Sequence, residues 1–262
     1  MEYLGYFASI IIGLSLGLIG GGGSILAVPI LVYLFNINPE LATSYSLFIV
    51  GITAMIGSYS QYKLGNLKIK PALAFAIPSL LSLLFVREIV LPKIPSVIFT
   101  LHHFEVSKNL LILIVFACLM IATSVSMIKK AIPKKTLQKD NFSKIALIGL
   151  LVGFLTGFLG AGGGFLIIPA LLFFANLPMK QAIGTSLLII FITSLIGFGG
   201  DVLNGISINF RLLFTISAIA ILGLFIGTYL SKKIDGAKLK PAFGWFLLAM
   251  GMYIIIKEFL LN

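Results

Sequence analysis

Charged residues are scarce in this sequence. Asp, Glu, Lys and Arg together make up 10% of the 262 residues, whereas 59% are apolar and the mean hydropathy is +1.14. Soluble domains carry a charge on about a quarter of their residues, so this composition excludes an ordinary soluble domain. Apolar runs fill nearly the whole chain and leave no stretch long enough for a separate soluble domain.

The chain also lacks the residue sets of enzymes and metal sites. A single cysteine, Cys118, excludes an intrachain disulfide framework. His102 and His103, with Glu105 nearby, have no further ligand set at metal-binding spacing, so we interpret them as loop residues. The apolar runs contain no His-Glu-x-x-His, paired acids or Ser-Lys dyad, and no Lys-Ser or Lys-Thr follows the glycine runs. We therefore expect no enzyme activity, no metal and no cofactor.

The net charge of +11 comes from 19 Lys and Arg against eight Asp and Glu. These basic residues lie in short connections and form no basic helical face with interleaved aromatics, so we expect no nucleic-acid partner. Basic loops beside membrane spans stay on the cytoplasmic side. The charge pattern therefore predicts a multi-pass protein of the cell (inner) membrane. We expect the first apolar run to stay in the mature protein, because no Lys or Arg precedes it.

Eight apolar runs predict an all-α, polytopic transmembrane helix bundle. The runs cover residues 4–35, 43–62, 71–91, 110–128, 145–175, 184–203, 211–230 and 241–261. The first and fifth runs are too long for one straight crossing, since about 31 residues would make a helix of about 46 Å against a core of about 30 Å.

The chain repeats itself at a shift of 140 residues. Residues 17–23, Gly-Leu-Ile-Gly-Gly-Gly-Gly, align with residues 157–163, Gly-Phe-Leu-Gly-Ala-Gly-Gly, and the register holds for about fifty residues. Each half also has glycines four residues apart, which let helix backbones approach closely in lipid. We therefore expect two homologous four-segment halves: a first repeat over residues 1–128, a basic cytoplasmic linker over 129–144 and a second repeat over 145–262.

Glycine runs predict a break in each overlong segment. Gly20–Gly23 and Gly162–Gly164 consist of the residue that costs about 1 kcal/mol in a helix interior. If each broken segment crosses once, the Lys and Arg residues split 11 to 8 between the two sides; if each segment enters and returns on one side, they split 14 to 5. The positive-inside rule favours the second arrangement, in which the two halves are inverted repeats.

The glycine breaks are also the predicted binding site. A helix that begins near Ser24 and another near Gly164 would each present unpaired N–H groups, which bind anions. The alternative is that the glycines only permit close helix crossing. Nearby hydroxyls could donate to an oxyanion or bond back to their own helices. The predicted substrate-binding residues are Gly20, Gly21, Gly22, Gly23, Ser24, Ser46, Gly160, Gly162, Gly163, Gly164, Thr185 and Ser186.

Asp201 is an acidic residue at the edge of a span in the second half, and its repeat mate is Gln61. Acidic residues inside a membrane are costly unless they pair or function. Asp201 is therefore a candidate for proton coupling, with Gln61 as its neutral counterpart. The alternative is a structural residue at the membrane interface.

The repeated motifs resemble the TauE/SafE family of sulfite and organosulfonate exporters. The resemblance rests on residues 17–23 followed by Pro29, on residues 157–164 followed by Pro169, and on residues 182–187, Ala-Ile-Gly-Thr-Ser-Leu. It covers almost the entire chain. The first half departs from the pattern, because Ser-Tyr-Ser at residues 44–46 replaces Gly-Thr-Ser.

This resemblance implies a secondary transporter that moves a sulfur oxyanion or a small organic acid by alternating access. The expected partners are the lipid bilayer and a small anion such as sulfite or an organosulfonate, and a homo-oligomer is left open. Import or export, and coupling to protons or to sodium, agree equally with these residues. The competing hypothesis is a membrane scaffold or assembly protein without transport activity.

Overall fold

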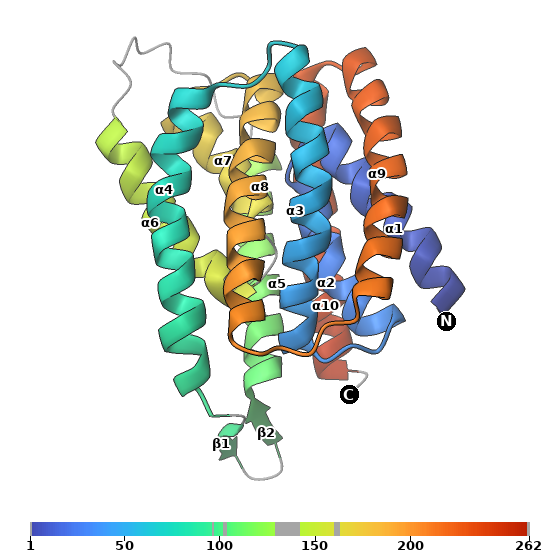
Figure 1. Ribbon diagram of the computed structural model, residues 1–262, viewed down its shortest axis with the longest axis vertical. Helices are drawn as coiled ribbons and strands as arrows, with labels where there is room; N and C mark the ends of the chain where they lie inside the picture. Colours follow the sequence, from blue (N-terminus) through green and yellow to red (C-terminus); the bar gives the residue numbers. More distant parts are fainter. Residues whose placement is uncertain (1, 96, 102–103, 129–141, 160–162, 261–262) are drawn as a thin grey trace.

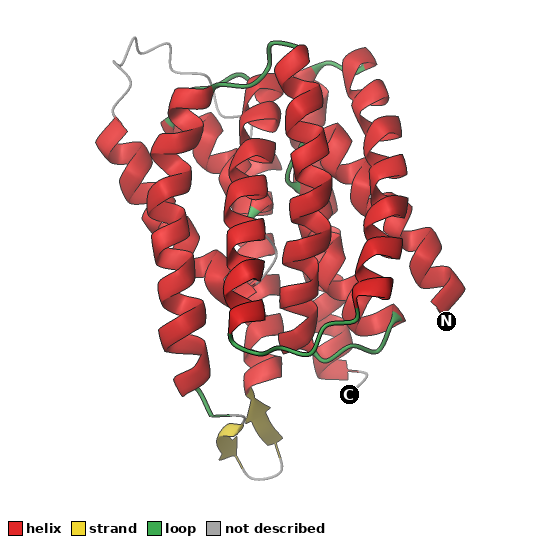
Figure 2. Ribbon diagram, viewed as in Figure 1, coloured by secondary structure: helices red, strands yellow, loops and turns green. Residues whose placement is uncertain are grey.

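The computed structural model describes residues 2–95, 97–101, 104–128, 142–159 and 163–260. Within these ranges ten α-helices form an elongated bundle, and one short hairpin extends from one end (Figures 1 and 2). The first half contains α1 (Glu2–Ile19), α2 (Gly22–Leu34), α3 (Pro39–Lys63), α4 (Ile69–Phe85), β1 (Val97–Leu101), β2 (Phe104–Ser107) and α5 (Lys108–Ile128). The second half contains α6 (Phe142–Leu159), α7 (Gly164–Phe174), α8 (Met179–Leu203), α9 (Phe210–Lys233) and α10 (Gly236–Leu260).

Six of the described helices are long and apolar enough to cross a membrane. They cover Pro39–Lys63, Ile69–Lys93, Leu110–Ile128, Met179–Leu203, Phe210–Lys233 and Pro241–Glu258. The second of these continues α4 through a π-helical turn at Val86–Val90 and a 3₁₀ turn at Leu91–Lys93. The predicted all-α transmembrane bundle is confirmed. The antiparallel β1–β2 hairpin lies where the sequence predicted a loop, and His102 and His103 lie outside the described residues.

Both overlong segments are broken at their glycines, as predicted. Helix α1 ends at Ile19 and α2 begins at Gly22, and between them Gly20 takes a φ of +79°, which favours glycine. Helix α6 ends at Leu159, residues 160–162 lie outside the described chain, and Gly163 precedes α7 with a φ of +66°. Figure 1 shows α2 returning toward the end of the bundle where α1 begins, and α7 returning toward the opposite end, where α6 begins.

Corresponding helices of the two halves run in opposite directions at the centre of the bundle. Glu40 at the start of α3 and Asn204 after the end of α8 line one cavity, whereas Gln61 near the end of α3 and Lys180 at the start of α8 line another. Helix α1 packs against α9, and α6, its counterpart, packs against α4, the counterpart of α9. These directions agree with the inverted arrangement, although inversion of the complete halves stays a prediction.

Basic residues gather at the upper end of the bundle in Figure 1. Helix α3 ends there at Lys63, α9 ends there at Lys233, and α8 begins there beside Lys180. Residues 129–141 of the predicted basic linker lie outside the described residues. Helix α6 already begins at Phe142, so its first turn includes the last residues assigned to the linker.

Glycines let two helix pairs, α1 with α9 and α6 with α4, touch through their backbones. A Cβ added to Gly13 on α1 would overlap the carbonyl oxygen of Ala220 on α9, and one added to Gly153 on α6 would overlap that of Ser79 on α4. Lipid provides little hydrophobic drive for helices to associate, so this close van der Waals contact stabilises the bundle. The predicted packing role of these four-residue glycine spacings is confirmed.

Gly13→Ala should therefore destabilise the protein. Its Cβ would overlap the α9 backbone, and overpacking of this kind costs about 1–3 kcal/mol. The matched control is Gly199→Ala on α8, where a Cβ would meet nothing within 4 Å. Thermal unfolding of both variants in detergent checks this prediction, and equal melting temperatures would contradict the close approach of α1 and α9.

Candidate functional site

The two glycine breaks meet inside the bundle. A Cβ added to Gly21, just before α2, would overlap the carbonyl of Gly164, the first residue of α7. A Cβ added to Gly164 would lie 2.7 Å from the Gly21 Cα atom and 3.0 Å from the hydroxyl oxygen of Ser24. The first turns of α2 and α7 therefore cross in backbone contact, and we call this contact the glycine crossing.

Helix α8 supplies a hydroxyl to the same place. A Cβ added to Gly20 would lie 2.8 Å from Ser186 Oγ and 3.0 Å from the carbonyl oxygen of Ile183. Ser24 and Ser186 are fully buried, and their hydroxyls donate back to their own helices, to Gly21 at 2.8 Å and to Ile183 at 2.9 Å. The structure thus brings five predicted residues together: Gly20, Gly21, Ser24, Gly164 and Ser186.

Other predicted residues lie around this crossing. Gly22 and Gly23 pack against α1, where a Cβ on Gly22 would lie 3.2 Å from the Ser15 Cβ atom. Gly163 lies beside the side chain of Thr156 on α6. Gly160 and Gly162 fall outside the described residues.

The remaining hydroxyls lie on the central helices. Ser46 is buried on α3, and its hydroxyl donates to the carbonyl of Thr43 at 3.1 Å. Thr185 on α8 accepts a hydrogen bond of 3.1 Å from the backbone N–H of Lys68. Thr185 therefore holds the connection between α3 and α4 against α8, away from the glycine crossing.

A buried ion pair lies near the opposite end of α8. Arg87, on the π-helical turn after α4, donates from Nε to Asp201 Oδ1 at 2.7 Å and from Nη2 to Asp201 Oδ2. Its Nη2 also donates to Ser44 Oγ at 2.7 Å, and its Nη1 donates to the carbonyl of Gly157 at 3.3 Å. The Arg87 and Asp201 side chains are 4% and 6% exposed. One guanidinium thus connects α3, α6 and α8.

Asp201 was predicted as a candidate, whereas Arg87 was not. Arg87 could have been singled out from the sequence, because it lies inside the apolar run 71–91 and cations within membrane spans are rare and usually paired or functional. The π-helical turn at Val86–Val90 is a second feature that is frequent at functional sites.

The ion pair lies in a cavity of about 430 Å³. Glu88 accepts a hydrogen bond of 2.7 Å from the side chain of Asn204, and Glu40 accepts one of 2.7 Å from Lys108. Three carboxylates and one guanidinium therefore line this space, which we call the acidic cavity. Its lining consists of Glu40, Thr43, Ser44, Arg87, Glu88, Leu91, Pro92, Ile112, Asp201, Asn204 and Ile206.

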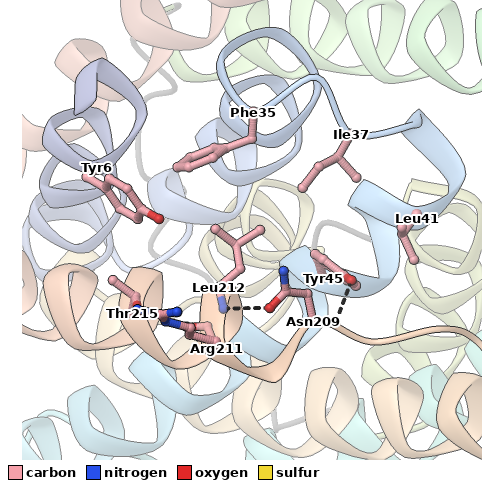
Figure 3. Close-up of a pocket in the computed structure, with 9 residues that line it drawn as sticks. All are labelled: Tyr6, Phe35, Ile37, Leu41, Tyr45, Asn209, Arg211, Leu212 and Thr215. Carbon is pink, nitrogen blue, oxygen red and sulfur yellow. Dashed lines mark hydrogen bonds between the residues drawn. The ribbon is translucent and has the colours of Figure 1, made fainter. Parts of the chain in front are cut away.

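Figure 3 shows a further cavity, of about 730 Å³, where α9 begins. Two of its polar residues, Tyr45 and Asn209, are engaged in local structure. Tyr45 accepts a hydrogen bond of 2.8 Å from the backbone N–H of Asn209 and donates one of 3.3 Å to the carbonyl of Ser207. The Asn209 side chain caps α9 by accepting from Leu212 N–H at 3.1 Å. Tyr45 is the repeat mate of Thr185, and each anchors a connection that leads into the following helix.

The Arg87–Asp201 pair predicts strong energetic coupling. Arg87→Gln or Asp201→Asn alone should destabilise the fold by about 3–5 kcal/mol, because each leaves a buried partner uncompensated, and the double variant should cost less than the sum. Glu40→Gln with Lys108→Gln is the control cycle, where the Glu40 side chain is 55% exposed and coupling should be about 0–1 kcal/mol. Unfolding midpoints in detergent measure both cycles, and additive effects at Arg87 and Asp201 would contradict the coupling.

Known proteins are similar in sequence to this chain over most of its length. The family described as "Sulfite exporter TauE/SafE" matches residues 6–254. A "Probable membrane transporter protein" of Xylella fastidiosa is 29% identical over 257 residues, covering 94% of this chain and 91% of the relative. Another from Methanocaldococcus jannaschii is 32% identical over 198 residues, covering 72% and 69%, and the Bacillus subtilis protein YunE is 28% identical over 218 residues, covering 75% and 78%. No solved structure matches significantly. The chain therefore belongs to the TauE/SafE family and is a multi-pass membrane transporter.

Proposed function

We propose that the protein is a secondary transporter for a small anion, and that sulfite, an organosulfonate or a related sulfur oxyanion is its substrate class. The observation that carries this proposal is the glycine crossing, where two half-length helices begin in backbone contact with each other. The family description names sulfite export, and the motifs of this chain agree with that description.

Two helix N-termini at one point favour negative charge. The first N–H groups of a helix have no acceptor within that helix, and each N-terminus carries about half a positive charge. Glycine keeps these N–H groups accessible, because no Cβ shields them. The side chains nearest to Gly20, Gly21 and Gly164 at the crossing are uncharged and belong to Ser24, Ile168, Ser186 and Ile190. An anion can therefore bind there without competition from a carboxylate among these contacts.

The crossing is closed in this conformation. Gly20, Gly21, Ser24 and Gly164 are all buried, and the serine hydroxyls are bonded to their own helices. Substrate entry therefore requires α2 and α7 to separate, with one half moving against the other as in alternating access. The hydroxyls of Ser24 and Ser186 would then turn from their helix carbonyls to the anion. Ser46 on α3 and Thr185 on α8 are the other predicted hydroxyls of the site.

The basic end of the bundle supports the proposal that the protein lies in the cell (inner) membrane with that end in the cytoplasm. Lys63, Lys180 and Lys233 all lie at this end. The opposite end carries the β1–β2 hairpin and the acidic cavity.

Gly164→Val tests the crossing directly. Its side chain would push α7 away from Gly21 and cover the N–H groups, so uptake of labelled sulfite or taurine into proteoliposomes should fall by at least about tenfold, or about 1.4 kcal/mol. Gly199→Ala is the control and should transport like the unsubstituted protein.

A thermal-shift screen with sulfite, thiosulfate, taurine and sulfoacetate gives a second readout. Absence of both transport and stabilisation for the unsubstituted protein would favour the scaffold hypothesis.

Asp201 is the coupling candidate within this proposal. A proton on its carboxylate would compete with Arg87 for the same oxygens, so protonation would release the ion pair that joins α3, α6 and α8. Asp201→Asn should therefore transport anions at a rate that no longer responds to an imposed proton gradient. Its mate, Gln61→Glu, is the comparison variant, and an unchanged gradient response in Asp201→Asn would assign Asp201 a structural role.

A further inference from the structure

A third cavity, of about 220 Å³, opens at the basic end of the bundle, where α3 and α9 end and α8 begins. We call it the basic cavity. Its polar lining consists of Gln61, Asn66, Lys180, Thr228, Ser231 and Lys232. Gln61 and Asn66 bond to each other, from Asn66 Nδ2 to Gln61 Oε1 at 2.9 Å. No Asp or Glu lines this cavity among the described residues.

Two hydroxyls and two ammonium groups in the basic cavity are candidate donors to a ligand. Thr228 and Ser231 are each 6% exposed and line the cavity, yet neither hydroxyl has a hydrogen-bond partner among the residues that the structure describes. Thr193 shows the usual alternative, because its hydroxyl donates to the Ile189 carbonyl one turn earlier. The ammonium groups of Lys180 and Lys232 likewise have no carboxylate partner in the described chain.

The acidic cavity is the counterpart of this basic cavity in the other half. Each residue that lines the basic cavity has its mate, 140 residues away, in the lining of the acidic cavity. The exchanges reverse the charge: Lys180 replaces Glu40, Thr228 replaces Glu88 and Lys232 replaces Pro92. Equivalent positions at the two ends of the bundle thus attract ions of opposite sign.

Helix α8 connects the basic cavity to the glycine crossing. A Cβ added to Gly184 would lie 2.7 Å from the Asn66 carbonyl oxygen and 3.1 Å from the Gln61 Cβ atom. Ser186 lies two residues further along α8 and contacts Gly20 at the glycine crossing. Because α-helices rise about 1.5 Å per residue, these two contacts lie about 3 Å apart along the axis of α8.

We propose that the basic cavity is an anion-binding site, which takes the charged group of a sulfonate, sulfite or small carboxylate before it reaches the glycine crossing. Lys180 and Lys232 supply the positive charge, and Thr228 and Ser231 donate to the oxyanion oxygens. This inference rests on the proposed function, because it assigns the mouth through which the transported anion enters. The acidic cavity, its counterpart, has carboxylates at two of the corresponding positions, Glu40 for Lys180 and Glu88 for Thr228.

Removing the donors should weaken substrate capture while leaving the crossing intact. Lys180→Gln with Lys232→Gln, and separately Thr228→Val with Ser231→Ala, should each raise the Kd for methanesulfonate and the transport KM by about tenfold. The maximal transport rate should stay within about twofold, since the crossing is unchanged. Lys233→Gln is the control, because it removes the same charge from the next residue, which does not line the cavity.

The outcomes separate the two proposals. If the unsubstituted protein transports anions and the cavity variants match Lys233→Gln, the basic cavity is not a binding site and the proposed function stands. A lower maximal rate with an unchanged KM would also overturn the inference, because it would indicate a structural role. If the unsubstituted protein neither binds nor transports any anion, both proposals fail.

Charged thiol reagents test the electrostatics of both cavities. Ser231→Cys and its repeat mate Leu91→Cys would be made in a Cys118→Ala background, so that each protein has one thiol. The anionic reagent sulfonatoethyl methanethiosulfonate should modify Ser231→Cys about tenfold faster than the cationic trimethylammonium reagent, and methanesulfonate should slow it. Leu91→Cys should show the reverse order of rates. The same order at both cysteines, no modification of Ser231→Cys, or no protection by methanesulfonate would contradict the proposal.

Discussion

The absence of side chains where two backbones touch is the constraint on which this structure depends. Gly21 and Gly164 bring the first turns of α2 and α7 into direct contact, and any Cβ at either position would overlap the other chain segment. Gly13 plays the same part between α1 and α9. Because lipid gives helices little reason to associate apart from close packing, the glycines determine both how the bundle holds together and where its helices begin and end.

This constraint leads directly to function. Non-helical backbone within a membrane protein must be buried by protein or line a cavity, and the two breaks satisfy that rule by burying each other. The same contact places two helix N-termini at one point, which favours an anion. Two cavities of different charge lie toward the two ends of the bundle. One contains the Arg87–Asp201 pair, and Lys180 and Lys232 line the other, with no carboxylate among its described lining residues. The chain therefore has a central contact between two helix N-termini, with chemically unequal cavities toward its two ends.

The sequence predicted much of this arrangement because the relevant signals are local. Apolar runs of about twenty residues identify the spanning helices, and glycine runs identify the breaks. The repeat identified which segments correspond. The predicted hydroxyl residues do not all lie at one place in the structure. Ser186 contacts the glycine crossing, whereas its neighbour Thr185 accepts a hydrogen bond from the backbone N–H of Lys68. Which hydroxyl faces the crossing depends on the rotation of α8 about its axis. The sequence of α8 is apolar on all faces and therefore does not predict that rotation.

Contacts between distant segments could not be predicted in the same way. Arg87 and Asp201 are 114 residues apart, and nothing in either local sequence names the partner. The two cavities likewise arise only when α3, α8 and the following helices pack together. Their correspondence becomes visible afterward, because the repeat maps one lining onto the other. Local chemistry thus predicted the breaks, whereas packing determined the ion pair and the mouths.

A crystal structure with bound selenite, a heavier analogue of sulfite, tests the central claim most directly. The account predicts an anomalous selenium peak within hydrogen-bonding distance of the backbone N–H groups that begin α2 and α7, close to Gly21 and Gly164. Selenium bound elsewhere only, or continuous helices through both glycine runs, would contradict it.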